Sequence, residues 1–417
     1  MRRTNVASTL FYQIAGVVLF FFLLMSCVLV GRPGTAVRAQ AQGAPSVGGC
    51  PLYPADNIWN RDISTLPVHP NSANFINSIG LTGHVHADFG SGLFNGEPIG
   101  IPFAVVSGNQ PTVPVSFSDS DESDPGPYPI PANAPIEGGA QSTGDRHVIV
   151  VDSATCKLYE MFNSFPQSNG SWKADSGAVW NLNSNALRPK KWTSADAAGL
   201  PILAGLARYD EVAAGAIDHA LRFTVSKSQR AFLWPGRHDA SSSTNPNLPP
   251  MGLRLRLKAS VNVAAYPPQS RVILTALQHY GMIVADNGSS WFISGAPDNR
   301  WNNDDLAQLK NIHGSDFEVV DESKLQVSAN SAQSFPANYS SMTIPPLADP
   351  TSVSLVAPLP TATPLDTRKG SVILYNNTNG GASTNALFFS ILTTVAVVIL
   401  SGAALIVFLA PRYKLRK

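Results

Sequence analysis

The sequence predicts a mainly β extracellular domain, a large β-sandwich or jelly roll with a few short helices, joined to one C-terminal transmembrane helix. Three observations predict it. Within residues 42–327, patterns typical of strands outnumber patterns typical of helices. Residues 328–385 are rich in Pro, Ser, Thr and Asn. Ala386 to Ala410 is an apolar run without a charge, and it is long enough to cross a bilayer as one helix.

Two segments carry the clearest strand patterns. Met251 to Lys258 alternates, with three leucines on one face and three cations on the other, which predicts a half-buried strand. His147 to Asp152 is a continuous apolar run, so we expect both of its faces to be covered. A short turn then leads into a partner strand, Cys156 to Phe162.

A hairpin and two helices complete the predicted elements. Met282 to Asp286, the turn Asn287-Gly288 and Trp291 to Ser294 have the pattern of a hairpin, because Asn-Gly accepts the positive φ that such a turn needs. Ser270 is placed to cap a helix that runs to Tyr280. Asn303 is placed to cap a second, amphipathic helix that ends at Ile312.

The N-terminal segment, residues 1–41, has the pattern of a signal peptide. Arg2 and Arg3 precede the apolar run Ile14 to Val30, and the small-residue site Ala39-Gln40-Ala41 follows. Cleavage after this site would leave an exported chain. The alternative is an uncleaved signal anchor, since the apolar run is long and the site lies 11 residues beyond it.

The C-terminal part of the chain, residues 328–417, is predicted to form a stalk, an anchor and a basic tail. Residues 328–385 have the composition of an extended, semi-rigid spacer. The apolar run 386–410 then enters the lipid bilayer, and residues 411–417 carry four cations that hold this end in the cytoplasm. We therefore expect a single-pass protein of the cell membrane whose bulk is extracellular.

The charge distribution excludes nucleic acid as a partner. The two terminal segments, 1–41 and 386–417, contain no Asp or Glu and eight of the 29 Lys and Arg. The external part is therefore acidic, which opposes binding to a phosphate backbone. Only Cys50 and Cys156 remain after signal removal. In an exported chain this pair predicts one disulfide, and two free thiols are the alternative.

No signature of a known catalytic class is present, and the sequence predicts no metal or cofactor. It contains no G-x-S-x-G, no H-E-x-x-H, no P-loop and no dinucleotide fingerprint. His84, His86 and Asp88 share one face of a predicted strand and have the residue types of metal ligands. That face carries no apolar residue, which favours a solvated polar edge over a metal site.

Two other segments place acidic and histidine side chains at a predicted sheet edge, where such groups can contact a ligand. Glu137 and the sequence Gly144-Asp145-Arg146-His147 come directly before the buried strand, at the rim of its sheet. Glu160 shares the face of Leu158 and predicts a buried carboxylate with a raised pKa or a cationic partner, for which Arg146 and His147 are candidates.

The stretch from Trp192 to His238 combines aromatic rings with polar side chains, as carbohydrate sites do. For His219 alone, a buried structural role is the simpler interpretation, because Leu221 and Phe223 share its face. The residues of this stretch that we take as candidates are Trp192, Asp196, His219, Arg222, Trp234 and His238.

Two functions fit these features. The first is a cell-surface hydrolase or lyase acting on a polysaccharide, with Glu137 and Asp196 as the carboxylate pair that glycoside hydrolysis requires. His147 and His219 would assist, and Trp192, Arg222, Trp234 and His238 would bind the substrate. The second is a non-catalytic carbohydrate-binding, adhesive or structural module, which accounts for the stalk and anchor equally well. It also accounts for the missing catalytic motif.

Overall fold

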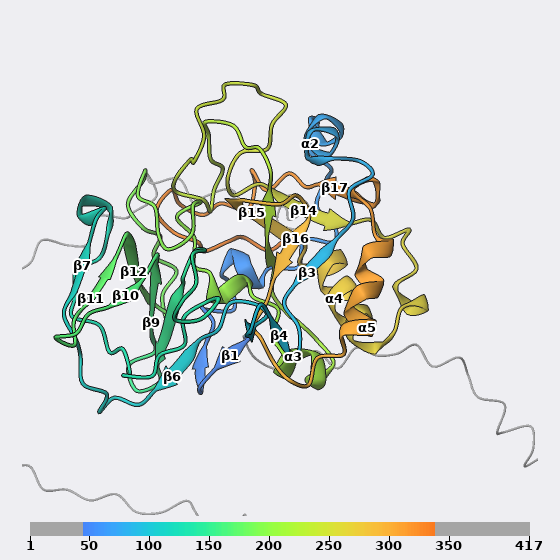
Figure 1. Cartoon of the computed structure of the whole chain (residues 1–417). Coiled ribbons are helices and arrows are strands. Elements are labelled where there is room, and N and C mark those ends of the chain that lie inside the picture. Colours follow the sequence, from blue (N-terminus) through green and yellow to red (C-terminus); the bar gives the residue numbers. More distant parts are fainter. Residues whose placement is uncertain (1–44, 338–417) are drawn as a thin grey trace, which may run out of the picture. The chain divides into compact units, whose positions relative to one another are not determined.

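The computed structural model describes residues 45–337, which form one compact body (Figure 1). The predicted signal peptide, the anchor at 386–410 and the basic tail lie outside these residues, as does all of the stalk beyond residue 337. Within residues 45–337, no helix combines the length and apolar character that a membrane span needs.

The largest sheet has six strands and holds the centre of the main core. Its strands are mixed in direction, since β13 pairs in parallel with β15 and antiparallel with β16, and β16 pairs in parallel with β3. In spatial order the strands are β17 (Phe317–Val319), β14 (Arg254–Leu257), β15 (Met282–Asn287), β13 (Leu221–Val225), β16 (Phe292–Ser294) and β3 (His86–Asp88).

A four-stranded sheet lies beside it, and smaller sheets decorate both (Figure 1). The four strands are β12 (Ser176–Asn181), β9 (Lys157–Phe162), β8 (Val148–Asp152) and β6 (Ala104–Val106). A three-stranded sheet joins β10 (Phe165–Pro166), β11 (Trp172–Ala174) and β7 (Val115–Phe117). Two ribbons pair β1 (Ser46–Val47) with β2 (Cys50–Pro51), and β4 (Leu93–Phe94) with β5 (Glu97–Pro98).

The helices are few and short. The α-helices are α2 (Ser72–Ile79), α3 (Tyr209–Ala214), α4 (Pro268–His279) and α5 (Asn303–Leu306). The 3-10 turns are η1 (Ile58–Asn60), η2 (Ser120–Glu122), η3 (Leu203–Gly205), η4 (Val263–Ala265), η5 (Ala307–Asn311) and η6 (Gly314–Asp316).

The expectation of a mainly β domain is confirmed, and the strand pairing is more mixed than a jelly roll allows. A jelly roll is wholly antiparallel, whereas β6 with β8 and β7 with β11 are further parallel pairs. The apolar run before Asp152 is buried along its whole length, as predicted. The predicted disulfide is also present, since Cys50 and Cys156 are bonded with their Cα atoms 5.3 Å apart.

The predicted hairpin from Met282 to Ser294 is wrong. Both segments are strands, but β13 lies between β15 and β16 in the sheet. The Asn287-Gly288 corner therefore carries the chain over the end of β13 instead of folding it back on a direct neighbour. The pairing of β13 with β15 joins residues about sixty positions apart, and no local turn pattern reports such a contact.

The solvent-facing side predicted for the strand after Met251 is also wrong. Its leucines are buried as expected, but the side chain of Arg254 is buried on the other face. That guanidinium donates to the carbonyl oxygens of Ile58 and Tyr280 and pairs with Glu322 at 2.9 Å. A cation that satisfies its donors in this way can lie inside the fold.

The two predicted helices are present with shifted ends. Helix α4 begins at Pro268, so Ser270 lies inside it and donates its hydroxyl hydrogen bond to the carbonyl of Asp305. Gly281, with φ +66°, follows the helix as predicted. Asn302 caps α5 in place of Asn303, because its side chain accepts from the amides of the first turn.

The segment after residue 327 packs on the body, so the predicted boundary with the stalk falls inside it. Arg237 donates to the carbonyl of Ala329 at 2.8 Å, and Trp234 donates to that of Ser331 at 2.8 Å. Arg61 holds the Ser334 carbonyl at 2.9 Å. These bonds fasten the last described residues to both the middle and the start of the domain.

Candidate functional site

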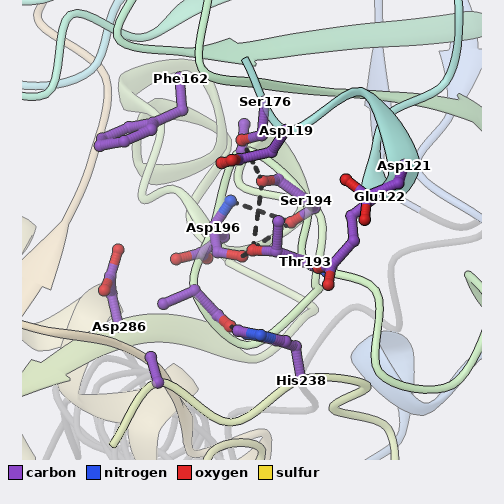
Figure 2. Close-up of a pocket in the computed structure, with 13 residues that line it drawn as sticks. Asp119, Asp121, Glu122, Phe162, Ser176, Thr193, Ser194, Asp196, His238 and Asp286 are labelled. Atoms are coloured by element: carbon purple, nitrogen blue, oxygen red, sulfur yellow. Dashed lines mark hydrogen bonds between the residues drawn. The ribbon is translucent and has the colours of Figure 1, made fainter. Parts of the chain in front are cut away.

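The first cleft has a volume of about 480 Å³ and an acidic lining (Figure 2). Asp286 reaches it from the carboxyl end of β15, and Asp119 reaches it from the turn that precedes η2. Five carboxylates line the cleft. Its charged and aromatic lining consists of Asp119, Asp121, Glu122, Phe162, Asp196, His238 and Asp286.

Asp286 has the most perturbed carboxyl group of this cleft. Burial raises its pKa, the nearby charge of Asp196 raises it further, and the net value is about 7. Arg222 and the amide of Asn287, which donates to the carboxylate at 2.6 Å, act in the opposite direction without cancelling the effect. At neutral pH a large fraction of Asp286 therefore carries a proton.

Asp196 is fixed beside Asp286 by a buried arginine. Arg222, on β13, donates through Nη2 and Nε to the two carboxylate oxygens at 2.8 and 3.1 Å. A third donor, Nη1, reaches the hydroxyl of Ser294 at 2.5 Å. Burial lowers the pKa of Arg222, but Asp196 raises it more strongly, so the guanidinium stays charged. Asp196 is a buried, fully paired carboxylate that lines the cleft.

The loop that presents Asp196 is held by its own hydrogen bonds. The hydroxyl of Ser194 accepts from the Asp196 amide at 2.9 Å and donates to the carbonyl of Leu200 at 2.6 Å. On the η2 side, Glu122 accepts from the Thr193 amide at 2.8 Å. His238 is tied through Nδ1 to the carbonyl of Ala197 at 2.9 Å. These hydrogen bonds therefore hold in place the loops that form the walls of the cleft.

A second cleft, of about 420 Å³, lies beside the Gly-rich loop 138–144. Glu137 and Asp88 line it together with the β4–β5 ribbon. The ribbon presents Phe94, which is 70% exposed, and Leu93, which is 65% exposed. An aromatic ring on the rim of a polar cleft is the arrangement that stacks on sugar rings.

Glu137 and His147 form a pair at the base of this loop. His147 Nδ1 lies 2.5 Å from the Glu137 carboxylate, and Nε2 lies 3.0 Å from the carbonyl oxygen of Ala195. Burial lowers the pKa of His147, but Glu137 raises it more strongly, to about 9. Burial raises the pKa of Glu137, and His147 outweighs that effect, so the net pKa is lowered.

Arg222 is shared by the two clefts. Its charge acts on Asp196 and Asp286 in the first cleft and on Glu137 in the second. His147, whose ring contacts the carbonyl of Ala195 next to Asp196, also bridges them. Four predicted site residues, Glu137, His147, Asp196 and Arg222, are therefore brought together, and His238 joins them in the first cleft.

The remaining candidates lie elsewhere. His219 is buried between Glu211, at 3.1 Å from Nε2, and the carbonyl of Ala220, at 2.7 Å from Nδ1. Trp234 packs against a separate core cluster and bonds to the C-terminal segment. Trp192 stacks under Arg188, whose guanidinium is 5.4 Å from the ring centre. Each of these side chains is satisfied by a structural contact.

Glu160 is buried, as predicted, but its partners are not Arg146 or His147. Its carboxylate accepts from the Trp180 indole at 3.0 Å and from the amides of Ile202 and Leu203 at 3.1 and 2.9 Å. Burial raises its pKa to about 7, although these three hydrogen bonds act against the shift. Neutral donors therefore take the place that a cation was expected to fill.

Asp286 was missed by the sequence analysis, although a signal for it exists. An acid that directly follows the apolar run Met282 to Ala285 marks the carboxyl end of a buried strand. Ligand sites in sheets with parallel strands gather at such ends. Treating this segment as half of a hairpin concealed the signal.

Comparison with family models, with curated proteins and with solved structures gives no match for this chain.

Proposed function

We propose that this protein is a membrane-anchored cell-surface enzyme that hydrolyses a polysaccharide in the first cleft. The export signal, stalk and anchor read from the sequence support the location. The acidic cleft, with a phenylalanine on its wall, supports the substrate class and the reaction.

The observation that carries the proposal is the neighbourhood of Asp286. Its pKa of about 7 keeps a proton available near neutral pH, as a general acid requires. In this scheme Asp286 protonates the oxygen of the leaving sugar. Asp196 remains paired with Arg222 and acts as a positioning residue, because its charge adds to burial in raising the pKa of Asp286.

The second carboxylate of the reaction is supplied by the other wall. Asp119 enters the cleft from the η2 side, whereas Asp286 enters from the β15 side (Figure 2). Asp119 is exposed to solvent, so it can act as the base that activates a water molecule. This replaces the pairing of Glu137 with Asp196, since Glu137 points to His147 and Asp196 is enclosed by Arg222.

Hydrolysis is favoured over lyase chemistry by the charge of the lining. A lyase must neutralise the carboxylate of a uronate, and this requires an available cation. Among the described residues that line the first cleft there is no Lys or Arg. Arg222 lies behind Asp196 and directs its donors to Asp196 and Ser294. The cleft therefore suits a glycan without negative charge.

A non-catalytic carbohydrate-binding or adhesive module is the second candidate. The exposed ring of Phe94 on the rim of the second cleft favours it, and the neighbouring Leu93 is also exposed. Such a surface binds a glycan without any need for Asp286.

Turnover of neutral and anionic polysaccharides by the full-length protein tests the proposal. Asp286→Asn should lower kcat by about 10²- to 10⁴-fold, because a general acid is lost. The matched control is Asp210→Asn, an exposed carboxylate in an ion pair away from both clefts, and it should retain full activity. If glycans bind but none is cleaved by the unmodified protein, the non-catalytic module is the function. Equal activity of Asp286→Asn would remove Asp286 from the mechanism.

A further inference from the structure

We propose that Glu137, Asp145 and His147 bind a divalent transition-metal cation of the Zn²⁺ or Mn²⁺ type at the edge of the second cleft. One potential ligand atom from each of the three side chains lies within 4.8 Å of the others. This assignment is independent of the reaction proposed for the first cleft, and the sequence analysis did not anticipate a metal here.

The spacing needs only a small adjustment. Ligand atoms about 2.1 Å from a tetrahedral metal lie about 3.4 Å from one another. The Glu137–His147 contact of 2.5 Å must therefore open slightly, and Asp145 must move inward. Asp145 is exposed to solvent, so its side chain can make this movement without disturbing the core.

The orientation of His147 is that of a metal ligand. A backbone carbonyl can only accept a hydrogen bond, so Nε2, 3.0 Å from the Ala195 oxygen, carries the proton. This leaves Nδ1 directed at the Glu137 carboxylate. Metal-binding histidines characteristically donate their other ring N–H to a carbonyl or carboxylate, which fixes the ring. The cation would replace the proton between Nδ1 and Glu137.

The backbone holds the ligands in place before any cation arrives. The amide of Glu137 donates to the carbonyl of His147 at 3.0 Å, which closes the base of the loop. The buried guanidinium of Arg146 donates to the carbonyls of Ala140 and Ser142 inside the loop and of Ser164 beside it. Arg146 itself has a φ of +51°. This turn sends Arg146 into the loop, and the residues on either side of it, Asp145 and His147, are two of the three proposed ligands.

The open side of the site faces the second cleft. The His147 side chain is 2% exposed, whereas that of Glu137 is 24% exposed and lines the cleft. Coordination positions not filled by protein would therefore be reached from the cleft.

The donor set indicates the class of cation. One imidazole and two carboxylates suit Zn²⁺, Mn²⁺ and related transition metals, whereas Ca²⁺ and Mg²⁺ prefer sites made of oxygen alone. We expect one Zn²⁺ or Mn²⁺ per chain, bound at least about tenfold more tightly than Ca²⁺.

Calorimetric titration of the chelator-treated, full-length protein with each of these cations is the first test. Asp145→Asn and Glu137→Gln should each weaken Zn²⁺ binding by about 10- to 100-fold. Glu97→Gln is the matched control, because it removes a carboxylate from the same cleft outside the ligand set. It should leave the affinity within about threefold, as expected for a charge effect alone.

Two further measurements separate loss of metal binding from misfolding and identify the type of ligand atom. Thermal unfolding of metal-free Asp145→Asn should match that of the unmodified protein, since Asp145 is exposed, so lost binding cannot be attributed to misfolding. The absorption spectrum of the Co²⁺ complex should show a nitrogen ligand in the unmodified protein. Absence of stoichiometric binding, equal binding of Ca²⁺, or affinities unchanged in both ligand variants would overturn the proposal.

Discussion

Two histidine–glutamate pairs in this protein make the same kinds of contact, but one lies in the core and the other lies beside a cleft. His147 and His219 are each almost fully buried, at 2% and 1% exposed. In both, one ring nitrogen contacts a glutamate and the other contacts a backbone carbonyl. The pairs differ in the third group that meets the glutamate.

At His219 that third group is a cation. Arg208 forms an ion pair with the free oxygen of Glu211, so both oxygens of this carboxylate are paired and the triad is closed. At His147 the third group is the carboxylate of Asp145, and a cleft adjoins. The pair at the cleft therefore lacks the neighbouring cation that completes the pair in the core. The neighbour decides whether such a pair is structural or is able to take a ligand.

The largest effect is expected where the closed triad is broken. Arg208→Met removes the cation and leaves Glu211 buried with His219 alone, so the free energy of unfolding should fall by about 3 kcal/mol. Urea unfolding followed by tryptophan fluorescence measures the change. Arg300→Met is the matched control, because Arg300 pairs with Asp210 and Asp298 at the surface. It should cost much less than Arg208→Met, because exposed ion pairs contribute little to stability. Similar losses in both variants would contradict the comparison.

Glu160 extends the comparison, because it is a buried glutamate whose hydrogen-bond partners include neither a histidine nor an arginine. Its oxygens accept three N–H donors. In Glu160→Gln, an amide NH₂ must face one or more of these donors, which should cost about 2 kcal/mol in unfolding free energy near pH 7. Equilibrium unfolding at pH 5 and pH 7 measures it. A stability equal to that of the unmodified protein at both pH values would show that the donors do not hold the carboxylate.

The third expected effect is a change in pH dependence at Asp286. Burial raises its pKa to about 7 in the folded protein, above the value of about 3.9 in an unfolded chain. Folding therefore retains a proton that the unfolded chain loses, and this contribution to stability is present below about pH 4 and lost as the pH rises to 7. Asp286→Asn cannot ionise, so its stability relative to the unmodified protein should increase steadily as the pH rises from 4 to 7 and then level off. Melting temperatures measured in chelator from pH 4 to pH 8 show whether the difference grows or stays flat.

The smallest effect is expected at the incomplete pair. Asp145→Asn changes an exposed side chain, so without metal the unfolding free energy should change by less than about 0.5 kcal/mol. The same urea titration used for Arg208→Met provides the number. A loss as large as that of Arg208→Met would mean that Asp145 is structural, and the two pairs would then not differ as described.

Strand and helix positions that depend on neighbouring residues could be predicted from the sequence. The leucines of β14, the apolar β8 and the end of α4 shortly before Gly281 all follow from local periodicity and backbone preference. The same reasoning failed where a distant segment intervened. Strand β13 separates β15 from β16, and local patterns do not record that insertion.

The candidate site was predictable only in part, for a related reason. Glu137 and His147 flank one loop, so their pairing is nearly local. Asp196 and Arg222 fall within the stretch from Trp192 to His238, which the sequence marks by its aromatic rings and polar side chains. The sequence could not show which acidic side chain pairs with which basic side chain. Arg222 occupies Asp196 from a strand 26 residues away, and His219 finds Glu211 within the core. These partners pair two of the expected catalytic groups, Asp196 and His219, with buried side chains that the sequence did not connect to them.

The fastening of the last described segment has a mechanical consequence. In a protein tethered through its C-terminal end, as the sequence predicts, traction enters the body after residue 337. It falls first on the bonds that Arg237 and Trp234 make with residues 329–331, and on those joining Ser334 to Asp56 and Arg61. These bonds join the C-terminal segment to the middle and the start of the domain. A pulling force would therefore load these bonds before it reached the strands that carry the clefts.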